Sequence, residues 1–235
     1  MKRQVAAWAA AICIGLAWQA RAAETTTRPT GMAQRSFEYT IDTSETPELK
    51  EWADKLRPDI EKWYAIYVEC LASDGYTAPK QFSITFRNMK GVAYTSGTRI
   101  VCAAAWFKAH PDDGGAIIHE LVHVVQQYRS RTNPPWLVEG VADYMRWFHY
   151  EPVSKRPRLR NPDRASYTNS YQVTAGFIEF VAKNHNHEIA VRFNAAMRQG
   201  RYEPELWQEF TGKTVDELWA EYVKSVKGAT TRPAN

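Results

Sequence analysis

After its first residues, the sequence of 235 residues contains no apolar run that approaches transmembrane length. At the start, Met1-Lys2-Arg3 precedes an apolar stretch from Val5 to Trp18, and Ala20-Arg21-Ala22 follows as a small-x-small cleavage site. This order is typical of a secretory signal peptide cut after Ala22, and the apolar stretch is too short to hold the chain stably in a membrane. We therefore expect residues 1–22 to be a signal peptide. The mature protein is expected to be secreted or periplasmic, with no membrane association.

An excess of charge of one sign is also absent. The chain has 30 Lys and Arg against 26 Asp and Glu, and the predicted signal peptide removes Lys2, Arg3 and Arg21 but no acidic residue. A nearly neutral mature chain lacks the basic surface that nucleic-acid binding requires, so no nucleic-acid partner is expected. The polar, Thr-rich residues 23–35 are predicted to form a disordered lead.

Cysteine is scarce, with 3 in the whole chain, and Cys13 lies in the predicted signal peptide. Cys70 and Cys102 remain, which allows at most one disulfide within a chain. An oxidising compartment would favour that bridge. Cys70 also continues an apolar helix face, so two thiols in the core are the equal alternative.

Internal repeats are absent too, and the mature length suits one domain with a real core. Alternating patterns predict strands at 37–41, 81–87 and 92–104, the last with a turn near Ser96-Gly97. Apolar residues spaced three and four apart predict helices, which cover 47–73, 135–148, 171–184, 188–199, 204–210 and 214–227. Pro58 should kink or divide the first helix, and Thr214 with Glu217 fits a capping box that opens the last. We expect an α+β fold in a single domain, residues 36–228. A small mixed or antiparallel sheet should pack beside a mostly helical body, with the active cleft between them.

What is present is the motif H-E-x-x-H, formed by His119, Glu120 and His123. Residues four apart lie on one face of a helix, so the two imidazoles can aim at a common point. Two neutral imidazoles at this spacing suit Zn²⁺, and Glu120 stands where its carboxylate can act as general base on a water molecule. Partnerless buried histidines would be costly, so a metal site is favoured over a chance match. The helix is predicted to be buried because apolar residues surround the motif, namely Ile117, Ile118, Leu121, Val122, Val124 and Val125.

A third protein ligand must come from elsewhere. The metzincin extension would need Gly at 126 and His at 129, where this chain has Gln126 and Arg129. Glu139, in the next predicted helix, is the better candidate, because a His, His, Glu set leaves one position open for water. His149 is its rival. Asp143 follows one turn after Glu139 and is expected to orient a ligand imidazole through its far nitrogen.

Four blocks of sequence also carry a resemblance to a known family. They are G-V-A-Y-T-S-G at 91–97, H-E-L-V-H-V-V-Q at 119–126, W-L-V-E-G-V-A-D-Y-M-R at 136–146 and Y-Q-V-T-A-G-F at 171–177. In this order the chain resembles the basic secretory protein family, zinc peptidases of plants and bacteria. The resemblance implies a gluzincin-like, and thus zincin-like, fold. It also implies that His119, His123 and Glu139 are the zinc ligands and that Glu120 is the base.

The predicted function is zinc-dependent hydrolysis of peptide bonds in peptide, protein or glycoprotein substrates, carried out by a monomer. Tyr171 is the candidate donor to the oxyanion, because a phenol can donate there, and Tyr167 and Tyr94 are rivals. Zinc peptidases of this shape place a strand beside the metal, where extended substrate can pair with it. Both Gly91–Thr95 and Arg99–Ala103 are open for that strand.

A protein of another class is the alternative: a zinc-containing module that binds glycan or cell-wall polymer without turnover. The 9 Trp of the chain would permit stacking on sugars. However, Trp52, Trp63 and Trp219 fall on predicted core faces. The presence of Glu120 also argues against this reading, because a purely structural zinc site needs no base.

Overall fold

The structure is a computed structural model that describes residues 37–230, so the predicted signal peptide (1–22) and disordered lead (23–35) lie outside the described residues. The chain divides into two compact units, one ending at Gln127 and the other beginning at Tyr128. The single domain over 36–228 stays a prediction. Across residues 37–230, no helix combines the length and the apolar character needed to cross a membrane.

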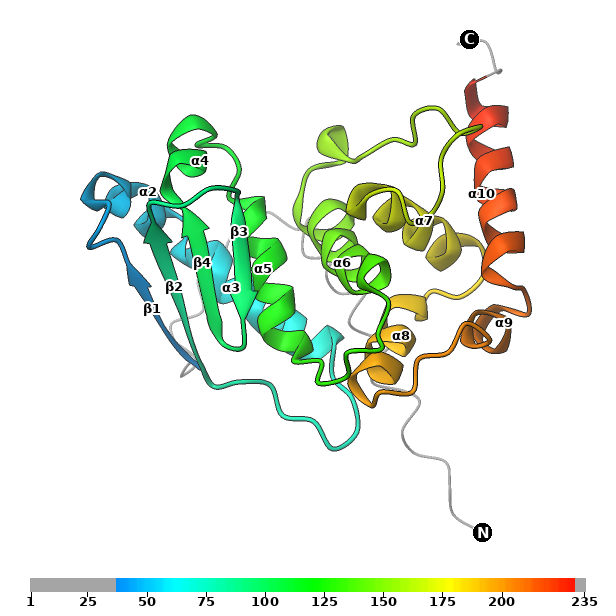
Figure 1. The fold of residues 1–235 in the computed structure, drawn as a ribbon, viewed down its shortest axis with the longest axis horizontal. Helices are drawn as coiled ribbons and strands as arrows, with labels where there is room; N and C mark the ends of the chain where they lie inside the picture. Colours follow the sequence, from blue (N-terminus) through cyan, green and yellow to red (C-terminus); the bar gives the residue numbers. More distant parts are fainter. Residues whose placement is uncertain (1–36, 231–235) are drawn as a thin grey trace, which may run out of the picture. The chain divides into compact units, whose positions relative to one another are not determined.

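The first unit is built on a mixed sheet, which confirms the predicted α+β class. Its strands are β1 (Glu38–Asp42), β2 (Gln81–Arg87), β3 (Ala93–Ser96) and β4 (Arg99–Ala103), and their order is β1-β2-β4-β3 (Figure 1). β1, β2 and β4 run parallel, while β3 pairs antiparallel with β4 through a hairpin. Gly97 takes φ +61° in that hairpin turn, a conformation that glycine adopts without steric cost. β3 is therefore the outermost strand at its end of the sheet.

One face of this sheet is apolar and carries the core. Side chains alternate along a strand, so every second residue of β2 is buried, and β4 continues the same face. Helices α3 (Arg57–Cys70) and α5 (Gly115–Gln126) cover it, α3 through the Tyr64 ring 4.6 Å from the Phe82 ring and α5 against β3 and β4. The buried residues of this face are Phe82, Ile84, Phe86, Ile100 and Cys102.

The helical region predicted at 47–73 is divided, as the proline indicated. A 3₁₀ turn, η1 (Pro47–Leu49), leads into α2 (Lys50–Lys55), and α3 begins after Leu56. Pro58 lies in the first turn of α3. A backbone N–H in this turn would have no acceptor within the helix, so its absence in proline costs no hydrogen bond. The short helix α4 (Ala104–Ala109) connects β4 to the loop before α5. Cys70 and Cys102 are separate thiols and form no disulfide with each other.

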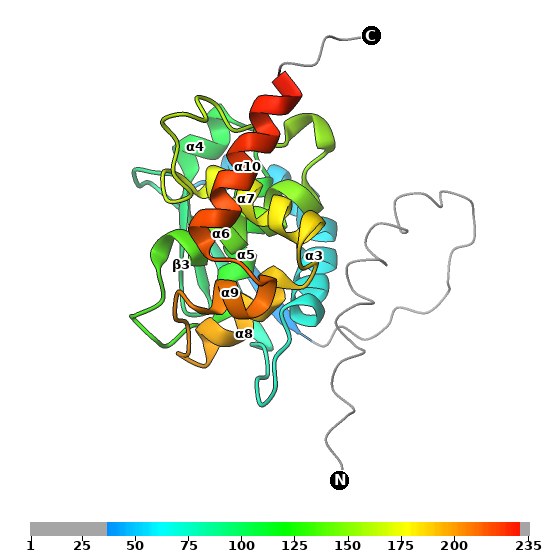
Figure 2. The same ribbon diagram turned by 90° about the vertical axis from the view of Figure 1, so that its right-hand side faces the viewer.

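Every regular element in the described residues of the second unit is a helix or a helical turn. It consists of α6 (Pro135–Tyr144), the π-helical segment η2 (Met145–Tyr150), the 3₁₀ turn η3 (Val153–Lys155), α7 (Tyr171–Asn184), α8 (Ile189–Arg198), α9 (Leu206–Thr211) and α10 (Val215–Thr230). α10 lies across α7, as Figure 2 shows. The predicted capping box is confirmed: the Glu217 carboxylate accepts from the Thr214 N–H at 2.8 Å, and the Thr214 hydroxyl accepts from the Glu217 N–H at 3.3 Å.

Aromatic side chains fill the core of this second unit. Trp207 is fully buried, with its ring centroid 4.4 Å from that of Phe193 and 5.4 Å from that of Phe177. Trp219 packs edge-on against Phe177 at 5.4 Å. These two tryptophans therefore take part in the packing of this unit.

Helices α6 and α7 approach each other closely at Gly140. A Cβ at this position would meet the Thr174 Cγ2 far inside van der Waals contact and the Thr174 Cβ at 2.8 Å. Thr174 is fully buried, and its hydroxyl donates to the Tyr167 carbonyl at 2.6 Å, so its side chain is not free to rotate away. Glycine at 140 thus permits the close packing of the two helices.

We predict that Gly140→Ala lowers the free energy of unfolding by about 1–3 kcal/mol, the usual cost of overpacking, despite the better helix propensity of alanine. Gly228→Ala is the matched control, because a Cβ on this exposed glycine of α10 meets no atom within 4 Å. That control should be neutral or stabilising by up to about 1 kcal/mol. Denaturant unfolding measures both. An equal effect of the two variants would contradict the packing explanation.

Candidate functional site

The candidate site of the first unit is centred on α5, which is buried almost all round. His119 and His123 lie one turn apart on this helix, and their Nε2 atoms are 3.2 Å apart with the rings inclined at 75°. Two nitrogen lone pairs that face each other at this distance repel, so the pair must share a proton or a cation. Two imidazole nitrogens, each about 2.0–2.1 Å from a tetrahedral zinc, would lie about 3.3 Å apart. The observed separation therefore fits the predicted ligand pair.

The orientation of His123 is determined by Gln126, one turn further along α5. Its side-chain oxygen lies 2.7 Å from His123 Nδ1, and the amide is almost completely buried. An amide oxygen only accepts hydrogen bonds, so Nδ1 carries the proton and Nε2 presents its lone pair to the other histidine. Sequence reasoning looked for an orienting group in Asp143 and missed Gln126. The i, i+3 spacing from His123 was the available signal.

Glu120 also has a definite partner. Glu120 is 8 % exposed, and its carboxylate accepts a hydrogen bond from the hydroxyl of Thr95 in β3, with 2.7 Å between Oγ1 and Oε2. The sequence left two stretches open for the strand beside the site, Gly91–Thr95 and Arg99–Ala103. Thr95, in the first of them, is the residue whose side chain reaches this carboxylate. Thr95 was not predicted as a site residue, although it belongs to the block at 91–97.

Cys102 lies on the inner face of β4, close enough to Glu120 for the two to interact. Burial and the negative charge of Glu120 raise the pKa of the Cys102 thiol far above its ordinary value. The thiol therefore stays protonated at physiological pH, and Cys102 is a core residue rather than a nucleophile.

The two tyrosines that rival Tyr171 as oxyanion donor have different surroundings. Strand alternation directs Tyr94 to the face of the sheet opposite to Thr95, and it is 49 % exposed. Tyr167 is half-buried, its ring packs against Trp136 at 4.9 Å, and its hydroxyl donates to Asp216 at 3.3 Å.

The remaining predicted site residues belong to the second unit. Glu139 and Asp143 are one turn apart on α6, and Asp143 is buried, contrary to the ordinary exposure of aspartate. Tyr171 opens α7 and is exposed. The roles predicted for these three residues stay predictions.

His149, the rival ligand, lies in the π-helical segment η2. Burial, with a smaller contribution from the nearby Arg156 charge, lowers the pKa of its imidazole to about 4, so the ring is neutral at physiological pH. It packs edge-on against Tyr144 at 4.8 Å, and its Nε2 has no hydrogen-bond partner within residues 37–230.

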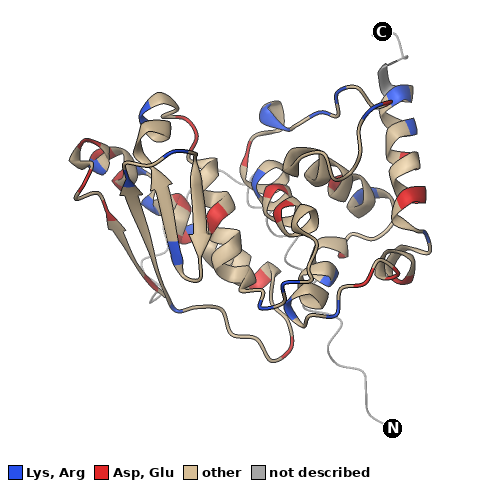
Figure 3. Ribbon diagram, in the orientation of Figure 1, with Lys and Arg blue, Asp and Glu red and all other residues tan. Residues whose placement is uncertain are grey.

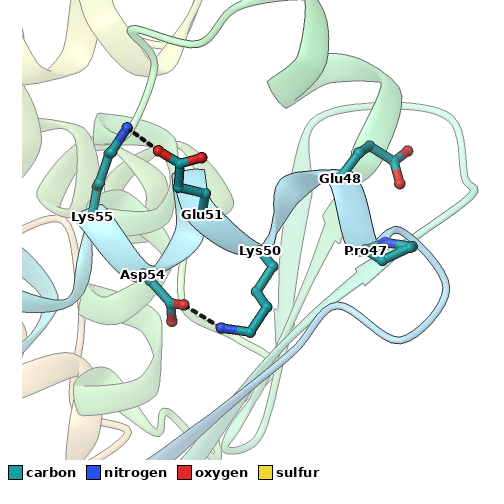
Figure 4. Close-up of a pocket in the computed structure, with 6 residues that line it drawn as sticks. All are labelled: Pro47, Glu48, Lys50, Glu51, Asp54 and Lys55. Atoms are coloured by element: carbon teal, nitrogen blue, oxygen red, sulfur yellow. Dashed lines mark hydrogen bonds and ion pairs between the residues drawn. The ribbon is translucent and has the colours of Figure 1, made fainter.

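A surface hollow on the first unit, shown in Figure 4, has no comparable chemistry. It is lined by Pro47, Glu48, Lys50, Glu51, Asp54 and Lys55. Its charges neutralise one another, because Lys50 contacts Asp54 at 2.6 Å and Lys55 contacts Glu51 at 2.7 Å. Figure 3 shows basic and acidic residues interspersed along the elements of both units.

Comparison with known proteins identifies the family. Comparisons with curated proteins and with solved structures gave no match. The family model described as "Peptidase of plants and bacteria", BSP, matches residues 64–222, which is more than half of the chain. This range includes the H-E-x-x-H helix, the Thr95 strand and α6. The chain therefore belongs to the BSP family of peptidases, the basic secretory protein family that its sequence blocks resemble.

Proposed function

We propose that this peptidase is zinc-dependent and acts outside the cytoplasm on peptide, protein or glycoprotein substrates. The observation that carries the proposal is the pair of converging histidine nitrogens, 3.2 Å apart on α5, with Glu120 between them in sequence. Support for export comes from the signal-peptide pattern of residues 1–22.

The proposed zinc ligands are His119, His123 and Glu139, each of which offers one ligand atom of a type that zinc accepts. Support for Glu139 comes from its position in the W-L-V-E-G block and from the open coordination position that a His, His, Glu set leaves. Asp143 is proposed to orient a ligand imidazole. Its burial supports this, since a buried carboxylate requires a hydrogen-bonded partner.

When bound, zinc would act as a Lewis acid on the scissile carbonyl and would favour ionisation of the attacking water. Glu120 takes a proton from that water as its oxygen bonds to the carbonyl carbon, and then delivers the proton to the amine nitrogen as the C–N bond breaks. Tyr171 is the proposed hydrogen-bond donor to the oxygen that gains negative charge.

A zinc-containing glycan-binding module is less well supported. Trp207 and Trp219 are used in the core of the second unit, and membership of a peptidase family favours turnover. The buried Glu120 has a place in a hydrolytic mechanism, whereas a binding module has no need of a base.

Digestion of casein and of a peptide library, with and without a metal chelator, tests the proposed function. The wild-type protein should cleave, and chelation should abolish cleavage. Glu120→Gln should retain its zinc but lose at least about 10²–10⁴-fold in turnover, the usual contribution of general-base catalysis. Glu209→Gln, an exposed carboxylate on α9, is the control and should keep full activity. Substantial cleavage by Glu120→Gln would reject this residue as the base.

The ligand set is tested by zinc titration of three variants. Glu139→Ala should lose zinc and activity together, because two imidazoles and solvent remain as ligands. Asp143→Ala should still bind zinc, with affinity or activity lower by about 10–100-fold, as expected for a group that acts through a ligand. His149→Ala should bind zinc like the wild type. Wild-type affinity in Glu139→Ala together with loss in His149→Ala would reverse the assignment.

Gln126 provides a separate test of the histidine pair. Gln126→Leu removes the acceptor at His123 Nδ1 and should weaken zinc binding by about 10–100-fold. Gln126→Glu keeps an acceptor oxygen and should bind zinc closer to the wild type. Competition with a chromophoric chelator measures all three affinities. Equal affinities in the wild type and Gln126→Leu would show that Gln126 does not orient the ligand.

A further inference from the structure

We propose that the Thr95 hydroxyl is the group that positions the Glu120 carboxylate for proton transfer. This inference rests on the proposed function of Glu120 as general base. It concerns a strand residue that reaches the catalytic helix from a position 25 residues earlier in the chain.

The placement of Thr95 follows from the sheet. β3 runs antiparallel to β4, with Thr95 opposite Ile100 and Ala93 opposite Cys102. Directly opposed residues share a face, and Ile100 and Cys102 belong to the buried face, so Thr95 also points to the side covered by α5. As β3 is the outermost strand, its inner side chains meet α5 at the border of the core, where Thr95 is half-buried.

The Thr95 hydroxyl can donate one proton, and two oxygen atoms of Glu120 lie within hydrogen-bond distance of it. Oγ1 lies 2.7 Å from the carboxylate Oε2 and 3.1 Å from the Glu120 carbonyl oxygen. The carbonyl already accepts within α5, and the carboxylate is both closer and charged, so it takes the stronger bond. Thr95 therefore holds Oε2, whereas Oε1 receives no hydrogen bond from the described part of the chain.

A second contact keeps the hairpin in register with the helix. Gln127, directly after α5, donates from its side chain to the Gly97 carbonyl at 2.7 Å and to the Val124 carbonyl at 3.0 Å. The β3–β4 turn is thereby joined to the end of α5, while Thr95 contacts its middle. With two attachment points, β3 cannot slide along the helix without losing both.

The two carboxylate oxygens of Glu120 therefore have different roles. Oε2 is anchored to β3, and Oε1 is the atom left to take the proton from water and return it to the amine. Anchoring one oxygen restricts the side chain to one orientation, which lowers the entropic cost of reaching the transition state. Thr95 is thus a positioning residue that acts through Glu120.

Thr95→Val, which replaces the hydroxyl by a methyl group of similar size, tests the proposal. Because a hydrogen bond to a charged group is lost, kcat should fall by about 10–100-fold. KM should change little, since Thr95 acts on the base and not on substrate binding. Thr95→Ser restores a hydroxyl and should recover most of kcat. Thr85→Val, on the outer face of β2, is the matched control and should keep wild-type kcat and zinc content.

Wild-type kcat in Thr95→Val, or an equal loss in Thr95→Ser, would overturn the positioning role and leave the proposed peptidase function intact. Should Thr95→Val fail to fold, as judged by thermal unfolding, Thr95→Ala against Thr95→Ser gives the same comparison.

An inactive wild-type protein would instead overturn the proposed function. Crystal structures of the metal-free wild type, Thr95→Val and Thr95→Ser then test the positioning without activity. Displacement of the Glu120 carboxylate in Thr95→Val but not in Thr95→Ser supports it, and an unchanged carboxylate in Thr95→Val overturns it.

Discussion

The first unit depends on one constraint: α5 is a buried helix that nevertheless carries two histidines and a glutamate. Burial of such groups is favourable only when each has a partner, because an unpaired buried polar group loses its hydration without compensation. Here the Thr95 hydroxyl meets Glu120, the Gln126 amide meets His123, and the two imidazoles meet each other. The polar chemistry of the helix and the strand that lies beside it are therefore linked.

The sheet provides these partners because of its order. β4 is an interior strand of the sheet, and its buried Ile100 and Cys102 lie on the face that α5 covers. β3 returns antiparallel on the outside, so its inner side chains reach α5, and within residues 37–230 no further strand pairs with its outer edge.

The second unit depends instead on the close approach of its helices. Gly140 allows α6 to contact α7, and the large aromatic residues around Trp207 fill the remaining space. α6 carries Glu139 and Asp143, so the packing that holds α6 in this unit also determines where both carboxylates project from it. Trp207 and Trp219 thus take part in the packing of this unit.

Periodicity and local chemistry determined much of this protein from the sequence alone. The division of the first helical region at Pro58, the hairpin at Gly97 and the capping box of Thr214 and Glu217 depend on residues close together in the chain, and all three were predictable. The spacing of His119 and His123 is likewise local, because four residues are nearly one helical turn.

Only the tertiary structure decided which strand lies beside α5 and which face each of its residues uses. Thr95 and Tyr94 are neighbours of similar pattern in the sequence, yet a strand directs them to opposite faces, one toward Glu120 and one away. That choice depends on the register between β3 and β4 and on the packing of α5, contacts between residues far apart in the chain that no local pattern records. The sequence therefore determined the H-E-x-x-H spacing, while long-range packing decided which residue contacts the Glu120 carboxylate.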